Sequence, residues 1–237
     1  MVSSLKNSVH VFGWGEAEKD YFTGQYKDAI AFLNEKLMVN SNSRAALSLL
    51  GYCYYMNQDF SNAVTCYEQL AQIFPNIEHY KLNHAQCLYQ LCHYEEAIRV
   101  LAGMANEVAG GGSGSVANSG SRAVTRNELL KLQAAIKYGQ DELPSAQALI
   151  DQLPADDVDK EVNLGCLLYK EERYEEAMDK FTNALSLEGY KPDLSYNVAL
   201  AHYQLKQYPL AMKYIGDIIE RGKNRTFAIN SSTRQAS

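Results

Sequence analysis

Tyrosine and amide side chains recur in this chain at a constant interval, and their chemistry is that of recognition. An amide donates and accepts hydrogen bonds at once, so a row of amides can hold a peptide backbone. Tyrosine adds rigid, amphipathic contact area at a low cost in side-chain entropy. Three pairs are each separated by 34 residues: Tyr55 and Tyr89, Tyr169 and Tyr203, Asn163 and Asn197.

The histidines and cysteines show no spacing that is typical of catalysis or metal binding. None of the five cysteines forms a Cys-x-x-Cys pair, and their odd number and scatter favour free thiols in a reducing compartment. Cys92 and His93 are adjacent, but the sequence offers them no orienting partner. We therefore expect no catalytic residue, no metal and no cofactor, and a protein that is not an enzyme.

The composition excludes two further classes of partner. Of the 237 residues, 46% are hydrophobic and 21% are charged, which is ordinary for a folded domain. The net charge of -6 gives no basic surface for nucleic acid. No run of 18 apolar residues is present, so we expect no insertion into a membrane.

A longer period organises the chain. In "LLGYCYYMNQDFSNAVTCYEQL" the small residue Gly51 is followed by aromatic Phe60, then Ala63, then bulky Tyr67. The same series starts again at Ala85, Gly165 and Ala199. This is the 34-residue tetratricopeptide pattern, in which two small residues let antiparallel helices approach closely and each pair must stack on the next. The sequence predicts an all-α fold, a right-handed α-solenoid of about six helix-turn-helix repeats.

Two further repeats are less regular and set the boundaries. Tyr26 stands in phase with the pattern, and "LLKLQAAIKYGQDELPSAQALIDQL" supplies a fourth helical pair. From Ala85 to Gly165 there are 80 residues where two periods need 68, so 12 are extra. The predicted organisation is a divergent N-terminal segment with a first helix (1–24), repeats one to three (25–107), a flexible Gly/Ser-rich loop (108–124), repeats four to six (125–222) and a polar tail that we expect to be disordered (223–237).

The first helices of such repeats line the inner, concave face. With the small residue counted as place eight, the sixth place is an amide in four repeats, the ninth includes Tyr52 and Gln86, and the twelfth is tyrosine in four repeats. Packing of the tyrosines against neighbouring helices is the alternative to partner binding. The predicted binding residues are Tyr52, Tyr55, Asn83, Gln86, Tyr89, Gln133, Asn163, Tyr169, Tyr196, Asn197 and Tyr203.

Several phrases are more specific than the generic repeat. Taken together in this order, "SRAALSLLGYCYY", "CYEQLAQIFP", "LKLQAAIKY", "VNLGCLLYKEERYEEA", "KPDLSYNVALAHY" and "IIERG" resemble the N-terminal part of the fleer-type tetratricopeptide subunit of intraflagellar transport complex B. The resemblance implies an all-helical superhelix that binds other subunits of the complex, closing around a proline-rich stretch of a core subunit. Members of the family continue for many more repeats, and we expect six repeats to make only an open arc.

The resemblance also implies a cellular role. The family is needed for cilium assembly, for anterograde transport driven by a kinesin-2 motor and for tubulin glutamylation in the axoneme, with a location in the cilium, basal body and cytoplasm. The interpretation is a non-catalytic scaffold. Two other classes stay open: a chaperone or adaptor module that binds peptides, which would need inward cations where only Lys170 stands, and an accessory subunit of a tubulin-modifying enzyme.

Overall fold

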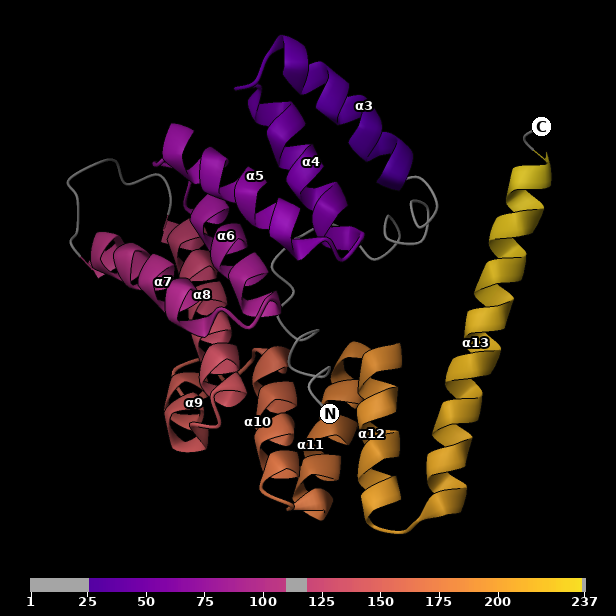
Figure 1. Ribbon diagram of the computed structural model, residues 1–237. Helices are drawn as coiled ribbons and strands as arrows, with labels where there is room; N and C mark the ends of the chain where they lie inside the picture. The colour runs from indigo at the N-terminus through magenta and orange to yellow at the C-terminus, as the bar shows by residue number, and fades with distance from the viewer. Residues whose placement is uncertain (1–25, 110–118, 236–237) are drawn as a thin grey trace. The chain divides into compact units, whose positions relative to one another are not determined.

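The computed structural model is helical wherever it describes the chain (Figure 1). It describes the backbone of residues 26–109 and 119–235 and the side chains of 26–104 and 126–222, and these ranges contain no strand. No helix in them is long and apolar enough to cross a membrane. The helices are α3 (Tyr26–Val39), α4 (Arg44–Met56), α5 (Phe60–Ile73), α6 (Glu78–Gln90), α7 (Tyr94–Ala109), α8 (Ser119–Gly139), α9 (Leu143–Ile150), α10 (Val158–Lys170), α11 (Tyr174–Glu188), α12 (Pro192–Gln204) and α13 (Tyr208–Gln235).

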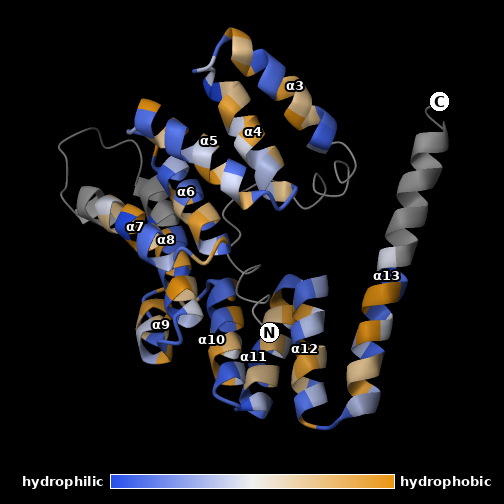
Figure 2. Cartoon of the chain, viewed as in Figure 1, coloured by the Kyte–Doolittle hydropathy of each residue, from blue (hydrophilic) through white to orange (hydrophobic). Residues whose placement is uncertain are grey.

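The chain divides into two compact units near residue 150. The N-terminal unit contains α3 to α9, and the C-terminal unit contains α10 to α13. Consecutive helices are packed against one another from α3 to α8 in the N-terminal unit and from α10 to α13 in the C-terminal unit, as stacked helical pairs require. Figure 2 shows that the helices carry both apolar and polar residues, so each has apolar side chains to bury against its neighbours.

The turn inside each helical pair has the same backbone shape in both units. One residue of the turn is left-handed in every case, and its flanking amides donate to carbonyls of the preceding helix. None of these residues is glycine, although glycine is the usual choice at such an end. The five positions, with φ between 61° and 68°, are Gln58, Cys92, Asp141, Glu172 and Lys206.

Close approach of the two helices in a pair explains the small residues. The second-helix alanines Ala63, Ala97 and Ala177 are fully buried. A Cβ built on Gly165 would lie 2.6 Å from Phe181 Cε1, and one on Gly51 would lie 3.0 Å from Tyr67 Cζ. The pattern in the sequence therefore reports a contact between backbone and aromatic ring.

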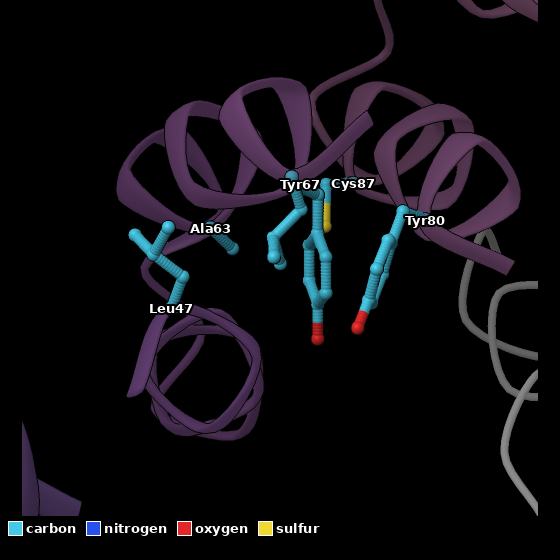
Figure 3. Packing of buried hydrophobic residues seen from close by; sticks show 6 residues of the cluster. Leu47, Ala63, Tyr67, Tyr80 and Cys87 are labelled. Atoms are coloured by element: carbon cyan, nitrogen blue, oxygen red, sulfur yellow. The ribbon is translucent and has the colours of Figure 1, made fainter. Parts of the chain in front are cut away.

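Tyr67 lies in a cluster of buried hydrophobic side chains of the N-terminal unit (Figure 3). It packs with Leu47, Ala63, Tyr80 and Cys87, which come from α4, α5 and α6. Arg44 Nε donates to Tyr80 Oη over 3.0 Å at the edge of the cluster. One cluster thus joins two consecutive repeats, which is how a solenoid acquires a continuous core.

The domain boundaries stay predictions, although some helix ends differ from them. Helix α8 begins at Ser119, inside the segment 108–124 that we expected to be a flexible loop. Helix α13 continues to Gln235, through most of the segment 223–237 expected to be a disordered tail; that segment contains no proline to stop a helix that is packed at its start. The divergent segment 1–24 and the loop residues 110–118 lie outside the described residues.

Candidate partner-binding face

Each twelfth-place tyrosine packs against the aromatic residue that opens the second helix of its own repeat. The ring centroids of Tyr55 and Phe60 are 5.3 Å apart with an interplanar angle of 68°. Those of Tyr169 and Tyr174 are 5.2 Å apart at 67°. Both are edge-to-face geometries, which aromatic pairs prefer. The pairs Tyr89–Tyr94 and Tyr203–Tyr208 repeat the arrangement at 6.0 Å and 5.5 Å.

Two of these tyrosines also tie one repeat to the next through their hydroxyl groups. Gln90 Nε2 donates to Tyr55 Oη over 3.2 Å, and Gln204 Nε2 donates to Tyr169 Oη over 3.1 Å. Each glutamine comes 35 residues after its tyrosine. Neither glutamine is among the binding residues predicted from the sequence. The shared spacing of 35 residues is the signal that could have found them.

The tyrosines therefore differ in what they can offer a partner. Tyr89 is only 2% exposed, while Tyr196 and Tyr203 on α12 are 46% and 58% exposed. Tyr52, Tyr55 and Tyr169 are half-buried. Burial raises the pKa of Tyr55, Tyr89 and Tyr169. Most of the predicted tyrosines thus pack within or between repeats. The two that remain accessible to a partner, Tyr196 and Tyr203, lie on α12.

The amides are more deeply placed than a surface ladder would be. Asn83, Gln86, Asn163 and Asn197 are all buried, and Gln133 is half-buried. Gln86 Nε2 donates to Tyr55 Oη over 3.4 Å, which joins two of the predicted site residues. Burial of an amide normally requires partners for both its donor and its acceptor.

Three acceptor oxygens depart from that rule. Within the described part of the chain, Asn83 Oδ1, Gln86 Oε1 and Asn163 Oδ1 are buried and receive no hydrogen bond. An unsatisfied buried acceptor costs about 1–3 kcal/mol. These oxygens lie on α6 of the N-terminal unit and α10 of the C-terminal unit, at the sixth and ninth places. They can accept donors from outside the chain.

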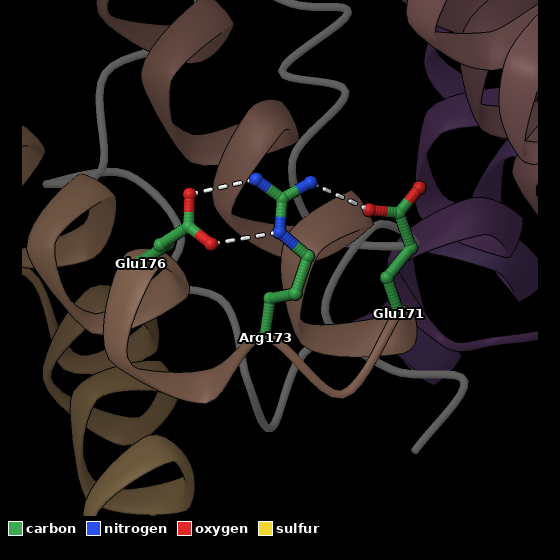
Figure 4. A network of polar contacts seen from close by, with 3 residues as sticks. All are labelled: Glu171, Arg173 and Glu176. Atoms are coloured by element: carbon green, nitrogen blue, oxygen red, sulfur yellow. Dashed lines mark hydrogen bonds and ion pairs between the residues drawn. The ribbon is translucent and has the colours of Figure 1, made fainter.

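The acidic run between α10 and α11 makes its contacts locally (Figure 4). Arg173 donates to both carboxylate oxygens of Glu176, over 2.8 Å and 2.7 Å, and to Glu171 over 3.1 Å. Hydrogen bonds from Arg173 hold the pKa of Glu176 below its usual value. All three side chains are exposed, so this cluster organises a solvated turn.

The described residues also show little reactive chemistry. No group of three or more His, Cys, Asp or Glu among them could hold a metal ion. Burial raises the pKa of the Cys66 thiol to about 11 and also raises the pKa of Cys53 and Cys87. Because the thiolate is the nucleophile, these buried thiols are poorly reactive at neutral pH.

Comparison with known proteins agrees with the helical pairs. A family model described as anaphase-promoting complex, cyclosome, subunit 3 matches residues 23–104, and a tetratricopeptide repeat model matches residues 162–224. The crystal structure of PilW, a type IV pilus biogenesis factor, superimposes with a TM-score of 0.59 at 14% identity, covering 84% of this chain and 87% of that one. A tetratricopeptide repeat protein from Parabacteroides merdae gives 0.59 at 15% identity, covering 92% and 80%. The chain is an α-solenoid of the tetratricopeptide repeat class.

More specific similarity lies with curated relatives. The chain is 48% identical over 198 residues to intraflagellar transport protein 70A of Xenopus laevis and 45% identical over 208 residues to intraflagellar transport protein 70B of Homo sapiens. Each match covers 84% of this chain. The chain is a homologue of the intraflagellar transport 70 proteins, which confirms the resemblance found in the sequence. It spans 28% of the length of the Xenopus relative and 29% of the human one.

Proposed function

We propose that this chain is a non-catalytic interaction scaffold of intraflagellar transport complex B, and that it binds an extended segment of a partner subunit on the inner face of its repeats. The homology to intraflagellar transport 70 proteins supports the cellular context. The unpartnered oxygens on α6 and α10 support the mode of binding. The context comes from relatives and the mode from this chain's own side chains, so the two can be tested separately.

We propose two contacts, each within one unit. One backbone amide of the partner donates to Asn83 Oδ1 in the N-terminal unit, and another donates to Asn163 Oδ1 in the C-terminal unit. Both oxygens are covered in the free chain. The partner segment must therefore displace the side chains that cover them and supply the missing donors. An extended segment fits this chemistry because its backbone amides are not used in a helix. The exposed Tyr196 and Tyr203 add contact area beside α10 in the C-terminal unit.

The same proposal includes the identity of the partner, the place in the cell and the effect of losing the protein. The partner is the proline-rich segment of a neighbouring core subunit, in which the residues other than proline supply the amide donors because proline has no backbone N–H. A kinesin-2 motor acts with the assembled complex. The chain works in the cilium, at the axoneme and basal body, and in the cytoplasm. Its loss impairs cilium assembly, anterograde transport and glutamylation of axonemal tubulin. Support for these points comes from the homology alone.

Calorimetry with a purified core subunit tests the binding mode. The variants are Asn83→Ala, Asn163→Ala and the double substitution. Each loss of an amide acceptor should weaken binding by roughly tenfold, because a donor in the partner is left unpaired. Removal of Oδ1 breaks no hydrogen bond of the free chain, but each alanine also leaves a cavity at a buried position. Thermal melts therefore check that every variant is folded at the temperature of the calorimetry.

Asn76→Ala is the matched control, since Asn76 is exposed in the turn between α5 and α6. It should leave affinity unchanged. Unchanged affinity in the double variant would remove the amides from the mechanism. Absence of any binding by the unsubstituted chain to core subunits would reject the proposed context instead. Tighter binding to acidic carboxyl-terminal peptides than to core subunits would favour the chaperone or adaptor class.

A further inference from the structure

Glu128 on α8 has a carboxylate oxygen, Oε2, that is buried and accepts no hydrogen bond from the described residues. His79 on α6 forms the one ion pair that those residues offer it, and His79 Nδ1 is 3.9 Å from Oε2, which is too long for a hydrogen bond. The Glu128 side chain is only 18% exposed. Buried charges in proteins are normally both paired and hydrogen-bonded. A donor from outside the chain could still satisfy this carboxylate.

The charges around Glu128 do not offset its burial. Burial raises the pKa of Glu128, and His79 on α6 and Lys131 on α8 both act in the opposite direction. The pKa is raised overall, so loss of contact with water outweighs the two neighbouring charges. The ionised carboxylate is therefore poorly compensated in the free chain, and a further cation beside it would stabilise it.

A second pair in the same unit has the same separation in a different environment. His93 Nδ1 is 3.9 Å from Glu96 Oε2 at the start of α7, and both side chains are 54% exposed. Water can solvate the Glu96 carboxylate, whereas it does not reach Glu128 Oε2. The comparison separates burial from the distance between histidine and glutamate. Glu96 is thus a matched control for Glu128.

Glu128 stands close to the inner-face amides of the N-terminal unit. Helices α6 and α8 are the first helices of consecutive repeats, and they contact each other. His79 and Asn83 are four residues apart, so they lie on one side of α6 and are about 6 Å apart along its axis. Asn83 Oδ1 is buried without a hydrogen-bond donor, as Glu128 Oε2 is. The contact with His79 therefore places this carboxylate about one helical turn from Asn83.

The C-terminal unit has other residues at both matched positions. His79 comes six residues before the small residue of its repeat, where α10 has Asp159. Glu128 comes seven residues before the small residue of its repeat, where α12 has Pro192. Proline carries no charge and aspartate is not a cation, so the pair of His79 and Glu128 is specific to the N-terminal unit. The repeat pattern does not require it.

We propose that Glu128 binds the guanidinium group of an arginine in the bound partner segment. This inference rests on the proposed function, because the arginine belongs to the segment whose backbone amide donates to Asn83. A guanidinium group presents paired donors in the geometry of a carboxylate. It is also more weakly hydrated than an ammonium group, so it loses less on entering a half-buried site. The His79 side chain is 52% exposed and can turn aside to admit the arginine.

Nuclear magnetic resonance titration of the ¹⁵N-labelled chain tests the assignment with two capped peptides. Ac-Gly-Pro-Arg-Pro-Gly-NH2 offers an arginine in a backbone that its prolines keep extended. The matched peptide has citrulline in place of arginine, which keeps the shape and removes the charge. The arginine peptide should shift backbone amides of α6 and α8 with saturation. It should bind roughly tenfold more tightly than the citrulline peptide, because a charged hydrogen bond is lost in the latter.

The carboxyl carbon of Glu128 gives a second measurement, which reports on charge and not on folding. In the ¹³C-labelled chain its chemical shift follows protonation of the carboxylate. A bound guanidinium group favours the ionised form. The arginine peptide should therefore lower the pKa of Glu128, and the citrulline peptide should leave that pKa unchanged.

Substitution of the carboxylate locates the site. Glu128→Gln keeps the shape and removes the charge, so the arginine peptide should bind no more tightly than the citrulline peptide. A carboxyl group whose pKa is higher in the folded than in the unfolded state costs stability above that pKa. The melting temperature of Glu128→Gln at pH 7 should therefore not fall. Glu96→Gln should leave the preference for arginine unchanged.

The outcomes distinguish this inference from the proposed function. Equal affinity of the two peptides, an arginine preference that survives Glu128→Gln, or no saturable shift in α6 and α8 would each reject the arginine subsite. Calorimetry with the purified core subunit separates the two proposals. If Asn83→Ala weakens that binding and Glu128→Gln does not, the backbone contact stands without the subsite. If the unsubstituted chain binds no core subunit, the proposed function itself fails.

Discussion

The helical pairs α6–α7 and α10–α11 occupy the same places of the repeat and pack differently. In α6–α7 the repeat pattern matches Ala85 with Leu101, and both residues are fully buried. In α10–α11, Gly165 stands opposite Phe181, whose Cδ1 would be 2.8 Å from a Cβ on the glycine. The choice between glycine and alanine is thus set by the size of the facing side chain, and the two positions vary together.

The two units also differ in the residues that fill their cores. Tyr26, Tyr67, Tyr80 and Tyr89 are buried in the N-terminal unit, whereas Phe181 is the large buried aromatic among the described residues of the C-terminal unit. A tyrosine brings a hydroxyl group that can lose a proton, and phenylalanine does not. The same fold should therefore respond differently to alkaline solution in its two halves.

The largest difference between the two units should be in how much stability each loses at alkaline pH. Burial raises the pKa of Tyr26 to about 12, and burial is also the main cause that raises the pKa of Tyr94 to about 12. An unfolded tyrosine ionises near pH 10. Between pH 10 and 12 the unfolded state therefore releases protons that the folded state keeps, so the free energy of unfolding falls as pH rises. Below pH 10 this contribution is fully present. Thermal melts followed by circular dichroism at pH 8, 10 and 11.5 measure it.

Phenylalanine substitutions assign that loss to a unit. Tyr26→Phe should make the fall between pH 10 and 12 shallower. Tyr203→Phe should leave it unchanged, because Tyr203 is 58% exposed. Equal effects of the two substitutions would show that buried tyrosines do not govern the alkaline response.

Adding one methyl group to the close approach should have the next largest effect. Gly165→Ala should destabilise the chain by about 1–3 kcal/mol, because Phe181 must move out of its packed position. Gly51→Ala should cost less, since its Cβ would be 3.0 Å from Tyr67 instead of 2.6 Å from Phe181. Urea unfolding at pH 7 gives both values.

A second substitution tests the pairing rule directly. Phe181→Leu in the Gly165→Ala background recreates the Ala and Leu pair of α6–α7, and it should recover part of the loss. A double-mutant cycle over the two positions would then give a coupling energy of about 0.5–3 kcal/mol. Strictly additive effects would contradict the rule.

Loss of the hydrogen bonds between repeats should change the free energy of unfolding by a smaller amount. Gln204→Ala removes a donor to Tyr169 Oη and should cost about 1 kcal/mol. Gln90→Ala should cost less, because Gln86 also donates to Tyr55 Oη. Urea unfolding of both variants measures the difference. An equal loss in the two variants would show that the second donor contributes nothing.

Removal of the ion pair between Glu161 and Lys180 in the C-terminal unit should have the smallest effect on stability. Glu161→Ala removes the partner of Lys180 and Asn183 and should cost about 0.2–1 kcal/mol, which is ordinary for a partly exposed pair. The loss should shrink in 1 M salt, where the Debye length is only about 3 Å. A loss that is independent of salt would indicate that Glu161 acts through packing.

The repeat is the part of this fold that could be predicted from the sequence, because it depends on small and aromatic residues at fixed spacings along the chain. Ala63, Ala97, Ala177 and Ala211 were placed at the close approach, and all are buried. The turns were not readable, because Gln58, Cys92 and Lys206 take up a left-handed conformation for which their side chains give no signal. The packed ends of two helices impose that conformation.

The candidate site was only partly readable. Spacing placed Tyr55 and Tyr169 in equivalent positions, but it did not show that each hydroxyl already has a glutamine partner. Asn83 and Asn163 were chosen as surface clamps, and they are buried with a free acceptor. Burial depends on what the next helix covers, and a pattern of one residue type along the chain does not contain that information.

Sequence by itself determined the helical pairs, their period and the family to which the chain is similar, because these follow from the order of small, aromatic and apolar residues. Tertiary structure decided which of those residues can still bind anything. Two cases show it: Tyr89 is enclosed while Tyr203 is exposed, and the Tyr55 hydroxyl already accepts a hydrogen bond from Gln90. The physical reason is that access depends on neighbours from other helices, and those are brought together only by packing.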